Sequence, residues 1–108
     1  MMLLTKAIEK ELPELYSQEK NADPICIVKF FDPTGSWTWF AYEGERQEDG
    51  DFLFFGLVKG FEEEIGYFSL NELQHAKDGV RGLQSLAIER DKFFKATPLS
   101  KVKENSNC

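Results

Sequence analysis

Four segments of the chain show the residue pattern of β-strands. They are rich in β-branched and aromatic residues, and short polar or glycine-containing connections separate them: residues 25–31, 36–43, 52–58 and 61–68. Residues 36–43 alternate strictly, so Trp37 and Trp39 share one face of a strand while Thr38 lies on the other. Because each segment follows the last after a short connection, the pattern predicts a four-stranded antiparallel meander with both tryptophans in its core.

The fourth strand carries an apolar series interrupted by one acid. Phe61, Ile65 and Tyr67 share a face with Glu63 at two-residue spacing. If that face is the inner one, Glu63 lies inward or at the sheet edge and needs a cation, for which Arg90 is the candidate. An ion pair, or a bulge that turns Glu63 outward, is the structural alternative to a catalytic carboxylate.

Helical spacing marks both sides of the sheet region. Thr5 can cap an amphipathic helix, which Pro13 should end or kink. Ser69 stands three residues before Glu72, the spacing of a capping box, and predicts a short helix that Asp78-Gly79 stops. Residues 86–94 are expected to be extended, and Thr97-Pro98 to cap and begin a last helical turn.

The fold class that follows is α+β. An antiparallel sheet of four to five strands packs with an N-terminal helix and with a short helix after strand four. At 108 residues the chain has the length of one domain, expected to span 1–108 with an ordered core at about residues 3–100 and a flexible tail at 101–108.

The composition is rich in aromatic and acidic residues. Aromatic residues make up 14% of the chain, and its formal net charge is −6. Residues 43–72 hold nine acidic and two basic groups, which is the whole charge deficit. A negative field repels phosphate backbones and attracts cationic partners, so nucleic acid is disfavoured as a ligand.

Cellular location is inferred from the start of the chain and from its cysteines. Charges fall within the first residues, leaving neither an apolar leader nor a membrane span, so a cytoplasmic location is expected. Reduced thiols are expected there, with Cys26 buried in an apolar run and Cys108 free in a polar tail.

Signatures of an active site are absent from the sequence. There is no phosphate-binding glycine loop, no serine-nucleophile motif and no clustered Cys and His of a zinc site. His75 is expected on the surface of a helix. The sequence therefore predicts no catalytic residue, metal or cofactor and favours a non-enzymatic function, with a carboxylate-based enzyme as the weaker alternative.

Three groups of residues are candidates for binding: Glu62 with Glu64, Trp37 with Trp39, and Glu89 with Arg90 and Asp91. Each has a structural alternative. The glutamates can simply keep the domain soluble, and the tryptophans can be core instead of a platform that stacks on bases. The charged triplet can hold a segment near the core through Arg90, which would neutralise partly buried carboxylates.

Three stretches together resemble a known family: WTWFAYE at 37–43, FFGLVKGFEEEIGYFSLNEL at 54–73 and IERDKFF at 88–94. The chain is similar to a family of short proteins of unknown function encoded on plasmids, conjugative transposons and phages. The resemblance implies a mobile-element setting and supplies no activity, ligand or catalytic residue. Loops such as 17–24 and 44–51 vary in such families, so little about function is expected to depend on them.

The leading functional hypothesis is a protein-interaction module with an acidic surface between Glu43 and Glu72, whose partner is a protein of basic character. A nucleic-acid-binding domain that uses the aromatic sheet face is the alternative. The sequence specifies neither the partner nor an oligomeric state.

Overall fold

The computed structural model describes residues 2–33, 35–75 and 88–104. Their helices and strands, in chain order, are α1 (Lys6–Glu11), β1 (Ile25–Cys26), β2 (Val28–Phe31), β3 (Thr38–Arg46), β4 (Phe52–Lys59), β5 (Glu63–Ser69), α2 (Leu70–Gln74), β6 (Glu89–Arg90), β7 (Thr97–Pro98) and α3 (Leu99–Glu104). The α+β class is confirmed.

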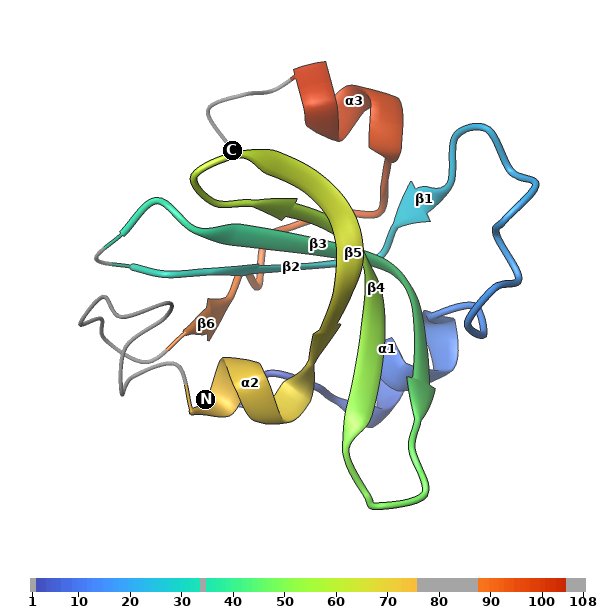
Figure 1. Ribbon diagram of the computed structural model, residues 1–108, viewed down its shortest axis with the longest axis vertical. Coiled ribbons are helices and arrows are strands. Elements are labelled where there is room, and N and C mark those ends of the chain that lie inside the picture. Colours follow the sequence, from blue (N-terminus) through green and yellow to red (C-terminus); the bar gives the residue numbers. More distant parts are fainter. Residues whose placement is uncertain (1, 34, 76–87, 105–108) are drawn as a thin grey trace.

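The main sheet has five strands in the order β5-β4-β3-β2-β6 (Figure 1). Each pair is antiparallel, so β2 to β5 form the predicted meander and β6 joins beside β2. Residues 25–31 do not form one strand, because Ile25 and Cys26 leave the sheet to pair with β7. The strand β3 runs on to Arg46, past the predicted end at residue 43, since Gly44 to Arg46 continue to pair with β4.

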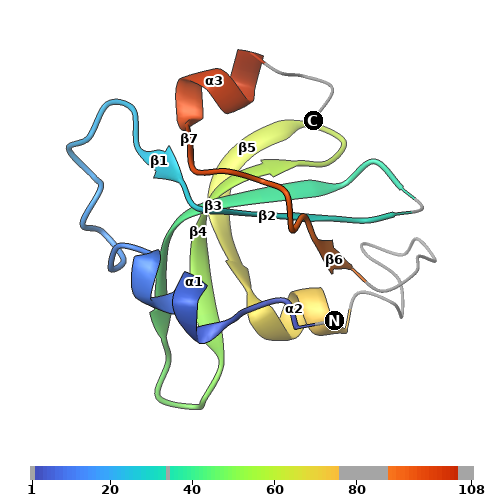
Figure 2. The ribbon, with the colours of Figure 1, turned by 180° about the vertical axis from the view of Figure 1, so that it is seen from behind.

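Helices and connecting segments cover both faces of this sheet (Figures 1 and 2). On one face, α1, the N-terminal arm and α2 pack on a core that includes Phe30, Trp39 and Phe54. On the other, the chain that leads to α3 packs on Phe40 and Leu57. Residues of β3 from Thr38 to Gly44 are accordingly buried whichever way they point.

Close packing between β3 and β4 requires a glycine at position 56. A Cβ atom at Gly56 would stand 1.9 Å from the Phe40 carbonyl oxygen, which no side chain could tolerate. Gly56 lies opposite Ala41, next to the point where the register between β3 and β4 shifts by one residue, between Ala41 and Glu43. The bulge lets β3 turn while both its faces stay covered.

The predicted helix starts at Thr5 and Ser69 are confirmed. The Thr5 hydroxyl accepts the Ile8 N–H, and Ser69 and Glu72 form the reciprocal capping box. The helix α2 ends at Gln74 with the exposed His75 as its C-cap. Asp78 and Gly79, expected to stop it, lie outside the described residues.

The predicted cap of the last helix is wrong. Thr97 and Pro98 form β7 with Cys26 and Ile25, and α3 begins only at Leu99. Its first turn is capped from elsewhere in the chain, because the Asp23 carboxylate accepts both the N–H and the hydroxyl of Ser100, at 2.8 and 2.7 Å. The helix then continues to Glu104 and buries Val102, within the segment expected to be a tail.

The predicted inner face of the fourth strand is also wrong. Phe61, Ile65 and Tyr67 are 74%, 42% and 49% exposed, while Phe68 is buried. Two-residue spacing states which residues share a face but not which face is covered. Glu63 does share the face of Ile65 and Tyr67, and its carboxylate lies 3.9 Å from Lys59, so its cationic partner is Lys59 and not Arg90.

Burial of the tryptophans yields a stability prediction. Trp39 is 5% exposed and its ring stacks on that of Trp37, with centroids 6.1 Å apart. Trp39→Ala should therefore lower the free energy of unfolding by about 3–5 kcal/mol in urea denaturation. Tryptophan emission of the folded wild-type protein at the wavelength of free indole in water would contradict the assignment.

Burial also predicts the reactivity of one thiol. Cys26 is fully buried, and desolvation raises its pKa to about 12. Its thiolate is therefore scarce at pH 8, and in a Cys108→Ser variant a thiol reagent such as DTNB should label Cys26 only after denaturant is added. Stoichiometric labelling of the folded variant would refute this burial.

Candidate functional site

Trp37 and Trp39 are core residues, confirming the prediction for the WTW strand. Trp37 is 6% exposed, and both rings lie on the sheet face covered by α1 and α2. A platform that stacks on bases needs open ring faces, which neither tryptophan has. Phe61, which is exposed, packs edge-on against Trp37 with ring centroids 5.5 Å apart.

The acidic segment 43–72 does not form one surface. Glu43 is 3% exposed and points into the protein. Glu45 and Glu48 are exposed on the β3–β4 hairpin, at one end of β4, whereas Glu62 and Glu64 are exposed at the other end, where β4 turns into β5 (Figure 1).

Glu89, Arg90 and Asp91 lie at the sheet edge beside β2 and are half-buried. The Arg90 guanidinium donates to the carbonyl oxygens of Met2 and Leu3, at 2.5 and 3.4 Å, and thus ties the N-terminal arm to β6. Asp91 forms an ion pair with Lys29 at 3.6 Å.

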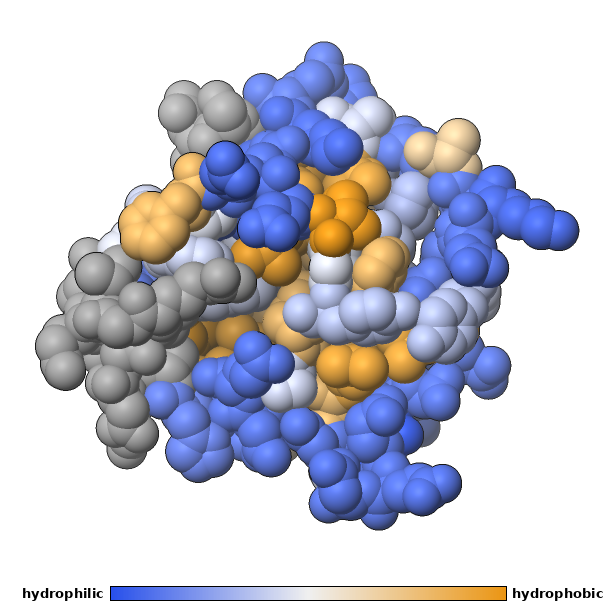
Figure 3. All heavy atoms as spheres, viewed as in Figure 1, coloured by the Kyte–Doolittle hydropathy of each residue, from blue (hydrophilic) through white to orange (hydrophobic). Residues whose placement is uncertain are grey.

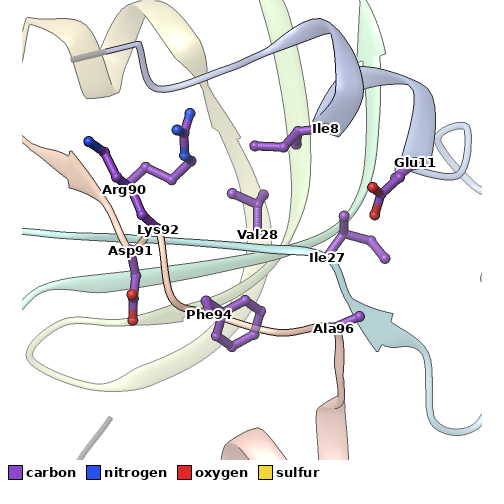
Figure 4. A pocket seen from close by; sticks show the side chains of 9 residues that line it. All are labelled: Ile8, Glu11, Ile27, Val28, Arg90, Asp91, Lys92, Phe94 and Ala96. Carbon is purple, nitrogen blue, oxygen red and sulfur yellow. The ribbon is translucent and has the colours of Figure 1, made fainter.

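A groove of about 390 Å³ separates this segment from α1 (Figure 4). Figure 4 shows Asp91 directed away from Arg90, with Glu11 across the groove on α1 and an apolar floor that includes Val28 and Phe94. Its charges are mixed in sign, and Asp91 is held by Lys29, so the groove presents no set of groups that converge on one ligand.

A second groove, of about 360 Å³, is aromatic and acidic. We call it the aromatic groove; it is lined by the rings of Tyr16, Tyr42, Phe55 and Tyr67 together with the carboxylates of Glu19 and Glu43. Neighbouring strands β3, β4 and β5 supply three of the rings, and the loop between α1 and β1 supplies the fourth. Figure 3 shows apolar and weakly polar side chains gathered over β5 inside a hydrophilic rim.

The four rings form a continuous row. Ring centroids are 5.6 Å apart between Tyr42 and Phe55, 4.7 Å between Phe55 and Tyr67, and 6.5 Å between Tyr67 and Tyr16. A side-chain hydrogen bond with Tyr16 raises the pKa of Tyr67 to about 12. Burial raises the pKa of Tyr42 as well.

Glu43 fixes the loop that closes this groove. Its two carboxylate oxygens each accept a backbone N–H, one from Tyr16 and one from Gln18, both at 2.8 Å. Tyr16 is held with φ of 70°, in the left-handed region that few non-glycine residues adopt. The charged acceptor thus compensates for local strain and sets the Tyr16 ring against Tyr67.

Neither Glu43 nor Tyr16 stands out in the sequence as a site residue. Their contact spans 27 positions of the chain and arises at a bulge, for which no short motif exists. The loop 17–24, expected to matter little for function, supplies Gln18 and Glu19 to the groove.

Residues 3–107 match the family described as "Protein of unknown function (DUF2958)". The chain belongs to this family. No curated protein and no solved structure matches this DUF2958 chain. Across the described parts of the DUF2958 chain, no helix has the length and apolar character needed to cross a membrane. The same residues contain no group of His, Cys, Asp or Glu side chains suited to a metal ion.

The role of Glu43 can be tested through stability. Glu43→Ala leaves the N–H groups of Tyr16 and Gln18 without their charged acceptor. Because a hydrogen bond to a charged group contributes about 1.5–3 kcal/mol, the free energy of unfolding in urea should fall by about 3 kcal/mol or more. The control Glu45→Ala removes an exposed carboxylate from the same strand and should change stability by less than about 0.5 kcal/mol. Equal stability of the two variants would exclude the anchoring role.

Proposed function

We propose that this DUF2958 protein is a non-enzymatic protein-interaction module that binds an extended segment of a partner protein along β5. The observation that carries the proposal is the position of β5 at the edge of the main sheet. In the described part of the chain, no strand pairs with the outer side of β5. The strand runs from Glu63 to Ser69, whereas the opposite edge strand, β6, spans only Glu89 and Arg90.

An edge strand offers backbone N–H and C=O groups to a further strand. Proteins usually protect a long edge with bulges, prolines or a covering segment, because an open one recruits other chains. No register shift interrupts the pairing of β5 with β4, and β5 displays Ile65 and Tyr67 to solvent. Strand addition would pair the backbone of the partner while these side chains provide selectivity.

Charge at the start of β5 favours a basic partner. Glu62 and Glu64 are exposed and have no ion-pair partner within the described residues, and Glu63 is only partly neutralised by Lys59 at 3.9 Å. Such a cluster speeds encounter with a cationic segment and makes the association sensitive to salt. For the biological setting we infer, from the sequence resemblance, an accessory protein of a mobile element that contacts a host or transfer protein.

Nucleic-acid binding on the aromatic sheet face receives less support. The two tryptophans that would stack on bases are buried in the core, with only 6% and 5% of their surface exposed. A carboxylate enzyme also receives less support, because Glu62, in the turn before β5, and Glu64, near the start of β5, both have exposed side chains.

The proposal predicts the outcome of a peptide selection. Random dodecapeptides displayed on phage and selected against the folded protein at low salt should be enriched in basic, alternating sequences. In NMR titrations such a peptide should shift the backbone amides of residues 63–69. Its N-methylated version, which cannot pair with a strand, should lose binding.

A charge-reversal pair supplies the matched control. Glu62→Lys with Glu64→Lys should weaken the selected peptide at least ~10-fold, because two attractive charges beside β5 become repulsive. Glu45→Lys with Glu48→Lys changes the net charge equally at the far end of β4 and should leave affinity nearly unchanged. Selected peptides that bind away from β5, or equal effects of the two pairs, would overturn the proposal.

A further inference from the structure

The aromatic groove is negatively charged, and its described lining includes no compensating cation. Glu19 and Glu43 contribute two carboxylates, and none of the described residues that line the groove is a lysine or arginine. Both oxygens of Glu43 accept backbone N–H groups, but a carboxylate has lone pairs for further donors, and the Glu19 side chain is exposed. A ligand that enters the groove therefore meets a negative field over an aromatic floor.

The negative charge and the aromatic rings together favour one chemical class of ligand over others. An anion would be repelled, and a purely apolar group would shield these carboxylates from water without bringing a positive charge or a hydrogen-bond donor, which is costly. A guanidinium or ammonium group instead gains attraction from the ring faces and from the carboxylates together. The volume of about 360 Å³ lies at the small end of the range for ligand pockets, which suits one long side chain better than a large molecule.

The groove is built before any ligand arrives. Glu43 holds the backbone of Tyr16 and Gln18, and Tyr16 keeps its left-handed conformation, so its ring already stands 6.5 Å from that of Tyr67. Strain of this kind persists where surrounding contacts fix it, and it occurs often at binding sites. Preorganised rings spare a ligand the entropy cost of ordering them.

We propose that the aromatic groove binds a cationic side chain, an arginine or a lysine, of the extended segment that pairs with β5. Ile65 and Tyr67 belong both to β5 and to the lining of the groove, so a strand added at this edge would run beside it. Delivery of the side chain in this way rests on the proposed function. The preference of the groove for a cation does not, and it can be measured alone.

The probe is N-acetyl-arginine methylamide, compared with N-acetyl-citrulline methylamide, which has the same shape without the charge. In NMR titrations of the labelled protein the arginine compound should shift the ring resonances of Tyr16, Phe55 and Tyr67. The citrulline compound should bind at least roughly five-fold more weakly, as expected when a cation–π contact and carboxylate attraction are both lost.

Variants locate the site without disturbing the fold. Glu19→Gln removes one exposed carboxylate and Tyr67→Leu removes one half-exposed ring, and each should weaken the arginine probe several-fold. Phe93→Leu changes a ring that is 91% exposed outside the groove and should have no effect. Retained amide spectra of the variants would show that each is folded.

The two proposals fail separately. Equal binding of the arginine and citrulline compounds, or shifts centred outside the groove, would overturn the cation site even if peptides pair with β5. Conversely, arginine binding in the groove with no peptide on β5 would leave the cation site standing and remove the strand-addition proposal.

Discussion

Burial of β3 on both of its faces is the constraint on which the rest of the structure depends. Such a strand needs an apolar layer on each side and strands packed tightly beside it. The first layer comes from α1 and α2, the second from the chain that leads to α3. Tight packing between the strands leaves no room at Gly56, where a Cβ would meet the Phe40 carbonyl at 1.9 Å. Segments near both ends of the chain, together with α2, form these layers, so a short sequence is enough to cover both faces of the sheet.

The proposed binding edge, which consists of β5 and the aromatic groove beside it, lies where the layer formed by the C-terminal chain ends. The C-terminal chain covers Phe40 and Leu57 of the central strands, but the same face of β5 displays Ile65 and Tyr67 to solvent. The aromatic row that begins under cover at Tyr42 therefore ends in the open at Tyr67 and Tyr16. Exposed apolar side chains on an edge strand are a liability for a protein with no partner. Their presence here gives the interaction proposal its physical basis.

Local signals in the sequence are enough to predict much of the fold. They predict little of the candidate site. The caps at Thr5 and Ser69 and the meander depend on neighbouring residues, and these predictions are confirmed. The inner face of the fourth strand was predicted wrongly, because exposure there depends on how far a distant segment reaches. The cap of α3 was missed for a similar reason, since Asp23 supplies it from 77 positions away. Glu43 likewise gains its role only when the bulge in β3 brings it to the loop at Tyr16.

The acidic residues also lie together in the sequence but apart in the folded structure. The nine acidic residues between 43 and 72 suggest one strong field. Folding turns Glu43 inward and places the exposed acids at opposite ends of β4, a strand of eight residues and so about 27 Å along its length. Screening in physiological salt acts over about 8 Å, so the two ends act as separate patches. An acidic contact with the proposed partner on β5 would therefore involve Glu62 and Glu64 and not the acidic residues of the β3–β4 hairpin.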